Sequence, residues 1–340
     1  MTWWHELIDA GAVPANFAPP PSAGAGRGGD VESGAASQPE PADLVEDAEL
    51  QAHALPDRDA ARIPRSVSFL AGIERWSVVA YDGVVQVVNA YVAAAIRRRD
   101  ERGVLRTTRN RSRAFALAPL ARMKAELRRR LEAAAPELEP MDAELVDDPT
   151  RYLDQVESKV RRARAAIERD LADAWIAGAG AGAQDDDWLV LDGLLSRSPA
   201  VARHPRALGV IKSHGAQFLE GRGLERALTL PAGNRTSVFA VHGGHTRAEV
   251  YSWYLRLWPW EGNDLLYGLL RVEARPDRET IDRATELSGW LWAERAPLAT
   301  PATRWDRLLY PLHNVEEYLK TLAPRDPQLR RVSRLPQTGT

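Results

Sequence analysis

The chain has 340 residues, no cysteine, 44% apolar residues and a formal net charge of −2. Without cysteine it has neither disulfides nor thiolate metal sites. Since it also lacks an 18-residue apolar run and a signal-peptide pattern, we expect a soluble, cytoplasmic protein without a membrane partner.

The charge is unevenly distributed. Residues 1–60 carry eleven acidic side chains against Arg27 and Arg58, which leaves 43 basic and 36 acidic side chains in the remainder. All basic residues except four lysines are arginine, the side chain whose planar fork suits phosphate. A basic body favours DNA as a partner, although a G+C-rich coding sequence also produces an excess of arginine.

The first 62 residues divide into two parts. Residues 2–14 predict a short helix with Trp3, Trp4, Leu7 and Ile8 on one side. We interpret 1–16 as a docking segment; the alternative, that the tryptophans pack on their own domain, stays open. Residues 17–62 are rich in Pro, Ala, Gly, Ser and acids, which predicts a disordered acidic linker.

Three β-rich runs open the folded body, at 66–73, 77–83 and 84–96. Their short polar or glycine turns predict an antiparallel meander. Helices are predicted next at 114–134 and 151–177. The GAGAG of 178–182 is predicted to be a loop, because it lacks the flanking strand and helix of a phosphate-binding motif.

The central stretch contains two apolar runs, 188–191 and 207–211, with the length of buried strands. About fifteen residues between them leave room for one short helix, so we predict a parallel βαβ unit. The runs end on Asp192 and Lys212. Because ligands bind at the carboxyl ends of strands in α/β sheets, we expect these two side chains to face one crevice. Asp192 could instead cap the following helix.

The C-terminal part continues with predicted strands at 237–242, 249–257 and 265–273. HGGH (242–245), between the first two of these strands, is predicted to be a hairpin turn. Its two histidines could instead hold a metal, although no third ligand lies nearby in sequence. Helices are predicted at 278–294 and 305–322, and 324–340 is expected to be a flexible basic tail.

The order of these elements predicts an α/β fold: an RNase-H-like mixed sheet with flanking helices and a C-terminal β/α elaboration. In that arrangement the first strand and the first parallel strand lie side by side. Acids on the two strands therefore converge, and a helix supplies another carboxylate for divalent cations.

Five segments, taken in order, are similar to the NurA family of DNA nucleases: SFLAGIERW, WLVLDGLL, GVIKSHGAQFL, WYLRLW with LLYGLLRVEA, and YPLHNVEEYL. The resemblance covers roughly 66–320 and implies a nuclease domain at 63–323. It also implies a ring-shaped homodimer and a 5'-3' exonuclease, with single-strand endonuclease activity as an addition. The cofactor it implies is Mn²⁺ (or Mg²⁺), and the partners are DNA ends and a HerA-type hexameric ATPase.

The resemblance also assigns metal ligands. Asp192 matches one ligand position, whereas Ala71 stands where family members carry the first-strand Asp. Either the chain is a naturally inactive member or its Asp was replaced, and we expect abolished or strongly reduced activity. Asp82, the next acid of the meander, is expected on the following strand. Glu168 is the predicted helical ligand, with Asp173 as the second choice.

Lys212 and His313 have two interpretations each, and Glu273 and Glu168 have structural ones. Lys212 binds a phosphate or positions the attacking water, or it forms a buried ion pair with Asp192. His313 is a proton donor or phosphate contact, or it caps a packed helix. Glu273 is expected to pair with an arginine, and Glu168 could instead pair with Arg164 at i,i+4 spacing.

Two other functions stay open beside the metal-dependent nuclease. A catalytically silent DNA-clamping subunit would suit Ala71. A different RNase-H-fold nuclease, acting on RNA or in strand transfer, would share the acidic site, because fold alone does not determine the substrate.

Overall fold

The computed structural model describes residues 3–15, 42–57, 60–179, 187–242, 248–298 and 305–324. Within these residues, thirteen strands join one mixed sheet whose main order is β2-β11-β12-β13-β9-β8-β4-β5-β6-β7. The long strands are β4 (Ser66–Asp82), β5 (Val85–Arg99), β6 (Leu105–Ala118), β8 (Asp187–Asp192), β9 (Ala207–Ile211), β12 (Val250–Arg256) and β13 (Leu269–Ala274). The short strands are β1 (Val13–Pro14), β2 (Asp43–Leu44), β3 (Ala52–Ala54), β7 (Leu138–Pro140), β10 (Asn234–Thr236) and β11 (Phe239–Val241).

Helices flank the sheet on both faces. They are α1 (Trp4–Asp9), α2 (Ala125–Ala134), α3 (Pro149–Ala179), α4 (Pro199–Ala202), α5 (Gly221–Leu228), α6 (Arg278–Ala293) and α7 (Tyr310–Leu322). Single 3-10 turns are η2 (Leu120–Arg122), η3 (Ala143–Asp147), η4 (Leu195–Arg197) and η5 (Trp305–Arg307). Within the described residues, none of these helices is both long and apolar enough to cross a bilayer.

The predicted fold class is confirmed. Strands β4, β5 and β6 are antiparallel neighbours, β8 lies parallel beside β4, and β9 lies parallel beside β8. This is the strand arrangement of an RNase-H-like fold. The predicted parallel pair is confirmed almost to the residue, because runs of buried β-branched and aliphatic side chains mark such strands clearly.

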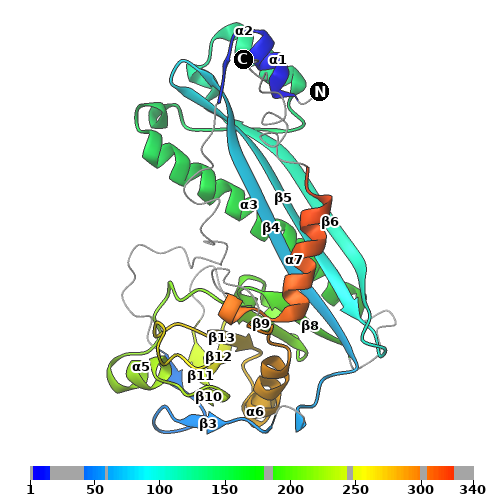
Figure 1. Cartoon of the computed structure of the whole chain (residues 1–340), viewed down its shortest axis with the longest axis vertical. Helices are drawn as coiled ribbons and strands as arrows, with labels where there is room; N and C mark the ends of the chain where they lie inside the picture. The colour runs from blue at the N-terminus through cyan, green and yellow to red at the C-terminus, as the bar shows by residue number, and fades with distance from the viewer. Residues whose placement is uncertain are drawn as a thin grey trace, which may run out of the picture.

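The meander differs from the prediction in how it is divided. Residues predicted as two strands form one strand, β4, whose ladder with β5 runs from Val67 to Asp82 with a single irregularity near Val78. Gly83 at φ +61° then makes the tight turn into β5. Figure 1 shows the result, a long ribbon of β4, β5 and β6 that extends diagonally away from the rest of the sheet.

The predicted helix at 114–134 is wrong over its first part, and β6 was missed. Residues 105–118 form that strand, and the helix begins only at Ala125. Most residues between Arg106 and Ser112 are exposed polar side chains, so the alternation that identifies a strand is absent there. Pairing with β5 determines the conformation instead.

Asp82 lies at the far end of the same strand as Ala71, not on the following strand. Its carboxylate accepts a hydrogen bond from the Lys124 amide at 2.6 Å at the start of α2. Eleven residues of strand separate the two positions by roughly 36 Å, so Asp82 cannot replace a ligand at position 71.

The predicted linker is wrong for the part that the structure describes. Residues 42–57 contribute β2 and β3, which pair with β11 and β10 at the opposite edge of the sheet. Glu46 forms a buried ion pair with Arg235 there, at 2.6 Å. Residues 16–41 lie outside the described part.

The N-terminal helix packs on its own chain. Trp4 and Leu7 are buried together with Leu127 and Leu131 of α2 and side chains from the turn end of the ribbon. The packing alternative is therefore what the structure has, and these two side chains are not available as docking anchors. Residues 180–186, 243–247 and 325–340, which include most of GAGAG, most of HGGH and the basic tail, lie outside the described residues.

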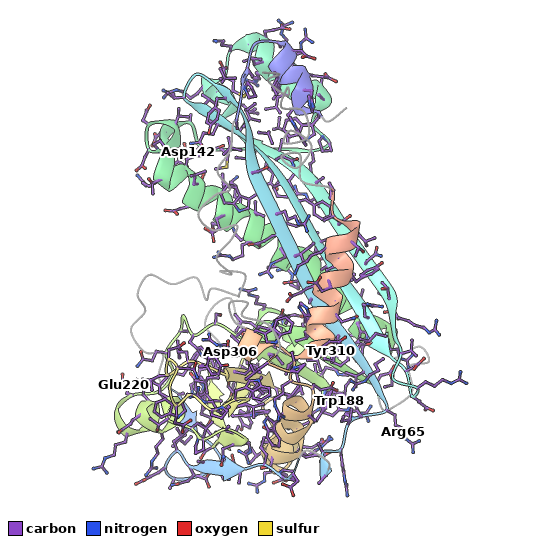
Figure 2. The ribbon with its side chains drawn as sticks, viewed as in Figure 1. Arg65, Asp142, Trp188, Glu220, Asp306 and Tyr310 are labelled. Carbon is purple, nitrogen blue, oxygen red and sulfur yellow. The ribbon has the colours of Figure 1, made fainter. Side chains whose placement is uncertain are left out.

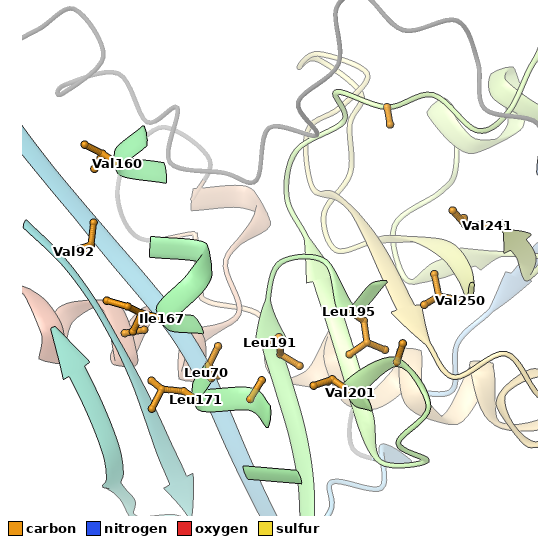
Figure 3. Close-up of a cluster of buried hydrophobic side chains, with 14 of the residues drawn as sticks. Leu70, Val92, Val160, Ile167, Leu171, Leu191, Leu195, Val201, Val241 and Val250 are labelled. Atoms are coloured by element: carbon orange, nitrogen blue, oxygen red, sulfur yellow. The ribbon is translucent and has the colours of Figure 1, made fainter. Parts of the chain in front are cut away.

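Besides this cluster at the turn end of the ribbon, two larger hydrophobic cores lie between the sheet and its helices. One lies between the sheet and α3 and includes Leu70, Ile167 and Leu191, as Figure 3 shows. The other lies under α6 and α7 and includes Phe69, Val190 and Leu312. Because alternate strand residues point to opposite faces, β4 and β8 contribute to both cores.

Candidate functional site at the carboxyl ends of the parallel strands

The candidate site is where β4 continues past its parallel neighbour β8. The parallel ladder ends at the pair Leu70–Leu191, so Ala71 and Asp192 are the next residues on the two strands. Ala71 shares the α7-facing core with Phe69, and Asp192 follows Trp188 and Val190 on the same face. Adjacent strands lie about 4.8 Å apart, so a side chain at 71 neighbours the Asp192 carboxylate.

Lys212 directly follows β9 and reaches the same place. Its Nζ donates a hydrogen bond to Asp192 Oδ2 at 2.8 Å and to Glu316 Oε1 of α7 at 3.5 Å. Only 6% of the lysine side chain is exposed. Asp192 and Lys212 therefore lie together, and of the two interpretations of Lys212 the structure has the buried ion pair.

Burial and mutual interaction shift the pKa values of this cluster. Burial raises the pKa of Asp192 above its ordinary value, and Glu316 adds to the rise while Lys212 opposes it. Burial lowers the pKa of Lys212, but Asp192 and Glu316 outweigh this, so its pKa is raised. The Lys212 ammonium therefore stays charged.

His313 lies one helical turn before Glu316. Its Nδ1 is 4.0 Å from Glu316 Oε2, and its ring packs edge-on against Trp305. Burial lowers the pKa of His313, with Lys320 and Lys212 contributing, although Glu317 opposes the change. Figure 2 labels Asp306 and Tyr310 on either side of the turn into α7, near where the ribbon meets the C-terminal half of the sheet. His313 is thus beside the cluster, as predicted.

Glu168 belongs to the other face of the sheet. A Cβ on Gly72 would meet the Glu168 carboxylate, and Gly72 points to the α3 side. Arg164 binds this acid at 3.6 Å (Nη1 to Oε1) and Glu74 at 3.2 Å (Nε to Oε2). The predicted i,i+4 pairing is confirmed, but the pair is buried, not solvated.

A small cavity of about 30 Å³ connects the two groups of acids. It lies between α3 and the end of β8, and its lining includes Glu168, Arg197 and Asp192. Such a space holds one or two water molecules. Glu168 and Asp192 thus border one cavity, although each is bound by a different basic side chain.

The remaining predicted residues have structural partners. Asp173 accepts a hydrogen bond from Ser198 Oγ at 2.6 Å, and Ser198, not Asp192, caps α4 by accepting from the Val201 amide. Glu273 binds Arg271 at 2.9 Å and accepts from the Ser196 amide, as its structural interpretation predicted.

The residues present do not assemble a divalent-cation site as they stand. Mn²⁺ and Mg²⁺ require several oxygen ligands around one point. Ala71 offers a methyl group, Lys212 neutralises Asp192 and Glu316, and Arg164 holds Glu168. Across the described ranges, one group of three ligand atoms lies within 4.8 Å, and it consists of Glu46, Asp47 and His53 at the opposite sheet edge.

The side chains of that second group already have partners within the protein. Glu46 is paired with Arg235, and Asp47 binds His53 at 2.8 Å and accepts from Ser237 Oγ at 2.7 Å. These bonds fasten residues 42–57 to the sheet, which accounts for the cluster without an ion.

Glu316 is the residue that sequence reasoning missed. The signal was present in YPLHNVEEYL, because His313 and Glu316 are three apart and therefore lie on one helix face. Its partner Lys212 is 104 residues away in the chain, and only the packing of α7 on the sheet brings them together.

The fold and this cluster define an RNase-H-like α/β protein with an acid–lysine centre at the ends of its parallel strands. A scan against models of known protein families finds no match, and a search of curated proteins finds none either.

Proposed function

We propose that this chain has the scaffold of a NurA-like, metal-dependent DNA nuclease whose hydrolytic centre lacks one ligand at Ala71. The observation that carries the proposal is the placement of Ala71 beside Asp192, where the parallel ladder ends. An Asp at 71 would add a carboxylate next to those of Asp192 and Glu316. In the present sequence we expect DNA binding with little or no cleavage.

The distribution of arginine supports DNA as the substrate. Before its short pairing with β7, the outer edge of β6 has no partner strand among the described residues, and this part of β6 carries the exposed residues Arg106, Arg109 and Arg111. A hollow of about 520 Å³ lies between this edge and α3, lined by Thr107, Arg109, Asn110 and Arg111 among others. Arginine forks and strand amides are suitable contacts for a phosphate backbone. By the resemblance, the working form is a homodimer acting on DNA ends together with a HerA-type hexameric ATPase.

The test is to supply the absent carboxylate. Ala71→Asp should cleave end-labelled DNA in Mn²⁺ on the order of a hundredfold faster than the unsubstituted chain, because ligand-shell changes alter metal sites by such factors. Ala71→Asn is the matched control, since it adds nearly the same volume without a charge. Circular dichroism melting establishes that both variants fold. A folded Ala71→Asp protein that leaves single- and double-stranded DNA intact would contradict the proposal.

A second candidate is a catalytically silent DNA-clamping subunit. The specific observation in its favour is Lys212, whose charge already satisfies Asp192 and Glu316 without a metal. This candidate predicts DNA binding by the unsubstituted chain and no gain of cleavage in Ala71→Asp. Parallel assays on RNA and RNA–DNA hybrid separate both candidates from a different RNase-H-fold nuclease.

A further inference from the structure

The cluster on the α7 face has the carboxylates of a cation site, but a lysine side chain supplies the positive charge. Two carboxylates from different elements, Asp192 of β8 and Glu316 of α7, converge on one ammonium. That ammonium belongs to Lys212, which is itself more than nine-tenths buried. A buried charge persists only when it is paired, so these three groups depend on one another.

Ala71 explains why a single positive charge is enough here. Its side chain is fully buried on the same face and adds no charge to the cluster. Lys212 lies within ion-pair distance of both carboxylates, at 2.8 Å from Asp192 and 3.5 Å from Glu316. Three carboxylates at this place would leave an excess of negative charge, which a divalent ion balances better than a lysine does.

We propose that the Lys212 ammonium occupies the position of a divalent cation between Asp192 and Glu316, and that Glu316 is the second carboxylate ligand of this site. The inference rests on the proposed function for the nature of the cation, since the class of nuclease implies Mn²⁺ or Mg²⁺. It follows that the unsubstituted chain binds Mn²⁺ poorly at this place, and that removal of the lysine charge opens the site.

The geometry makes Lys212 replaceable by an ion. A lysine is a compact point charge on a flexible stem, in contrast to the rigid fork of an arginine. Its Nζ is 2.8 Å from one carboxylate oxygen and 3.5 Å from the other, so the ammonium is held asymmetrically. Carboxylates are preferred ligands of Mn²⁺ and Mg²⁺, and water can complete the shell.

The test measures Mn²⁺ binding to the full chain, by the loss of the free-ion signal in electron paramagnetic resonance. Lys212→Gln should bind Mn²⁺ on the order of tenfold more tightly than the unsubstituted chain, and the gain should be lost in Lys212→Gln/Glu316→Gln. Lys320→Gln is the matched control, because this exposed lysine of α7 forms an ion pair with Glu317, at 2.6 Å, outside the cluster. Equal Mn²⁺ affinity in Lys212→Gln and the unsubstituted chain would overturn the inference, as would a gain that survives Glu316→Gln.

A second pair of variants applies if Lys212→Gln does not fold. In the Ala71→Asp background, Glu316→Gln should lower Mn²⁺ affinity on the order of tenfold, because one carboxylate ligand is removed. No change in that pair would equally overturn the role of Glu316. Since the readout is metal binding, it is independent of DNA cleavage: Ala71→Asp can cleave DNA although Glu316 is no ligand, and Lys212→Gln can bind Mn²⁺ without cleaving DNA.

Discussion

The two faces of β4 carry similar arrangements of charged side chains with different chemistry. On the α7 face, Lys212 lies between Asp192 and Glu316. On the α3 face, Arg164 lies between Glu74 and Glu168. Each cluster consists of one basic side chain shared by two acids and is mostly buried. The residues of β4 that separate them, Ala71 and Gly72, are adjacent in sequence.

The comparison shows why substitutions at two adjacent positions, 71 and 72, affect different clusters. Alternation sends position 71 toward α7 and position 72 toward α3. The α3 cluster holds a guanidinium that stays charged at any accessible pH, so we regard it as structural. The α7 cluster holds a lysine shared by two carboxylates, and a lysine, unlike an arginine, is a compact charge whose pKa shifts readily when it is buried.

The largest effect is expected when the basic residue is removed. Arg164→Met keeps the apolar stem but leaves Glu74 and Glu168 buried without their arginine, and we expect a loss of about 3 kcal/mol in the free energy of unfolding. Lys212→Met should cost less, because Asp192 and Glu316 can share a proton. Urea denaturation at neutral pH measures both.

The control for this pair is Arg128→Met. Arg128 pairs with Glu132 on the exposed face of α2, and such pairs contribute about 0.5 kcal/mol or less. A larger loss in Lys212→Met than in Arg164→Met would show that the α7 cluster is the structural one, and the comparison would be reversed.

Substitutions at the adjacent positions 71 and 72 should destabilise the protein by different amounts. Gly72→Ala places a methyl group against the Glu168 carboxylate and 3.1 Å from the Ala93 carbonyl oxygen, so we expect a loss of about 2 kcal/mol from overpacking. Ala71→Gly removes one buried methyl group and should cost about 1 kcal/mol. Thermal and urea unfolding measure both changes.

Mn²⁺ binding provides an independent check on the same two variants. Neither should alter the low Mn²⁺ affinity of the unsubstituted chain, because Lys212 stays in place. If Ala71→Gly proves the more damaging of the two, then the space above Gly72 is not tight and the two faces differ less than we infer.

The last expected effect concerns pH and defines the pH at which the two clusters should be compared. Burial, with nearby Arg307, lowers the pKa of His214 to about 3, and its Nε2 donates to the Leu269 carbonyl at 3.1 Å. The unfolded chain takes up this proton near pH 6.5, whereas the folded chain does not. Stability is therefore full well above pH 6.5 and falls as the pH drops toward 3, by roughly 2 kcal/mol at pH 5.

His214→Asn should reduce this loss between pH 7.5 and pH 5, although the variant is less stable overall. The pKa values of His204 and His313 are also lowered by burial, so part of the acid sensitivity should persist. Urea midpoints at the two pH values measure the difference. An unchanged difference in the variant would show that His214 accepts a proton in the folded chain.

Much of the fold was predictable because its signals are local. The runs 188–191 and 207–211 are continuous and apolar, which marks buried parallel strands, and the helical spacing of Val156, Val160 and Ile167 marks α3. The convergence of Asp192 and Lys212 followed from a general rule, that the carboxyl ends of neighbouring parallel strands meet at one edge of a sheet.

Other elements had no local signal. Strand β6 is polar along its exposed half and exists because β5 offers a long partner. Residues 42–57 have the composition of a linker, yet Leu50 is buried and Glu46 binds a buried arginine 189 residues away. In each case the partner is distant in sequence, so composition predicts the wrong state.

By itself, the sequence determined which side chains stand where the parallel ladder ends: an uncharged alanine at 71, an aspartate at 192 and a lysine at 212. Only the tertiary structure decided which of them act together. The packing of α3 put Glu168 on one face of the sheet, whereas Asp192 and Lys212 pair on the other. The docking of α7 then brought Glu316 to Lys212. The physical reason is that local sequence specifies the direction of a side chain along its own element, whereas the packing of elements against one another determines which charges share a buried space.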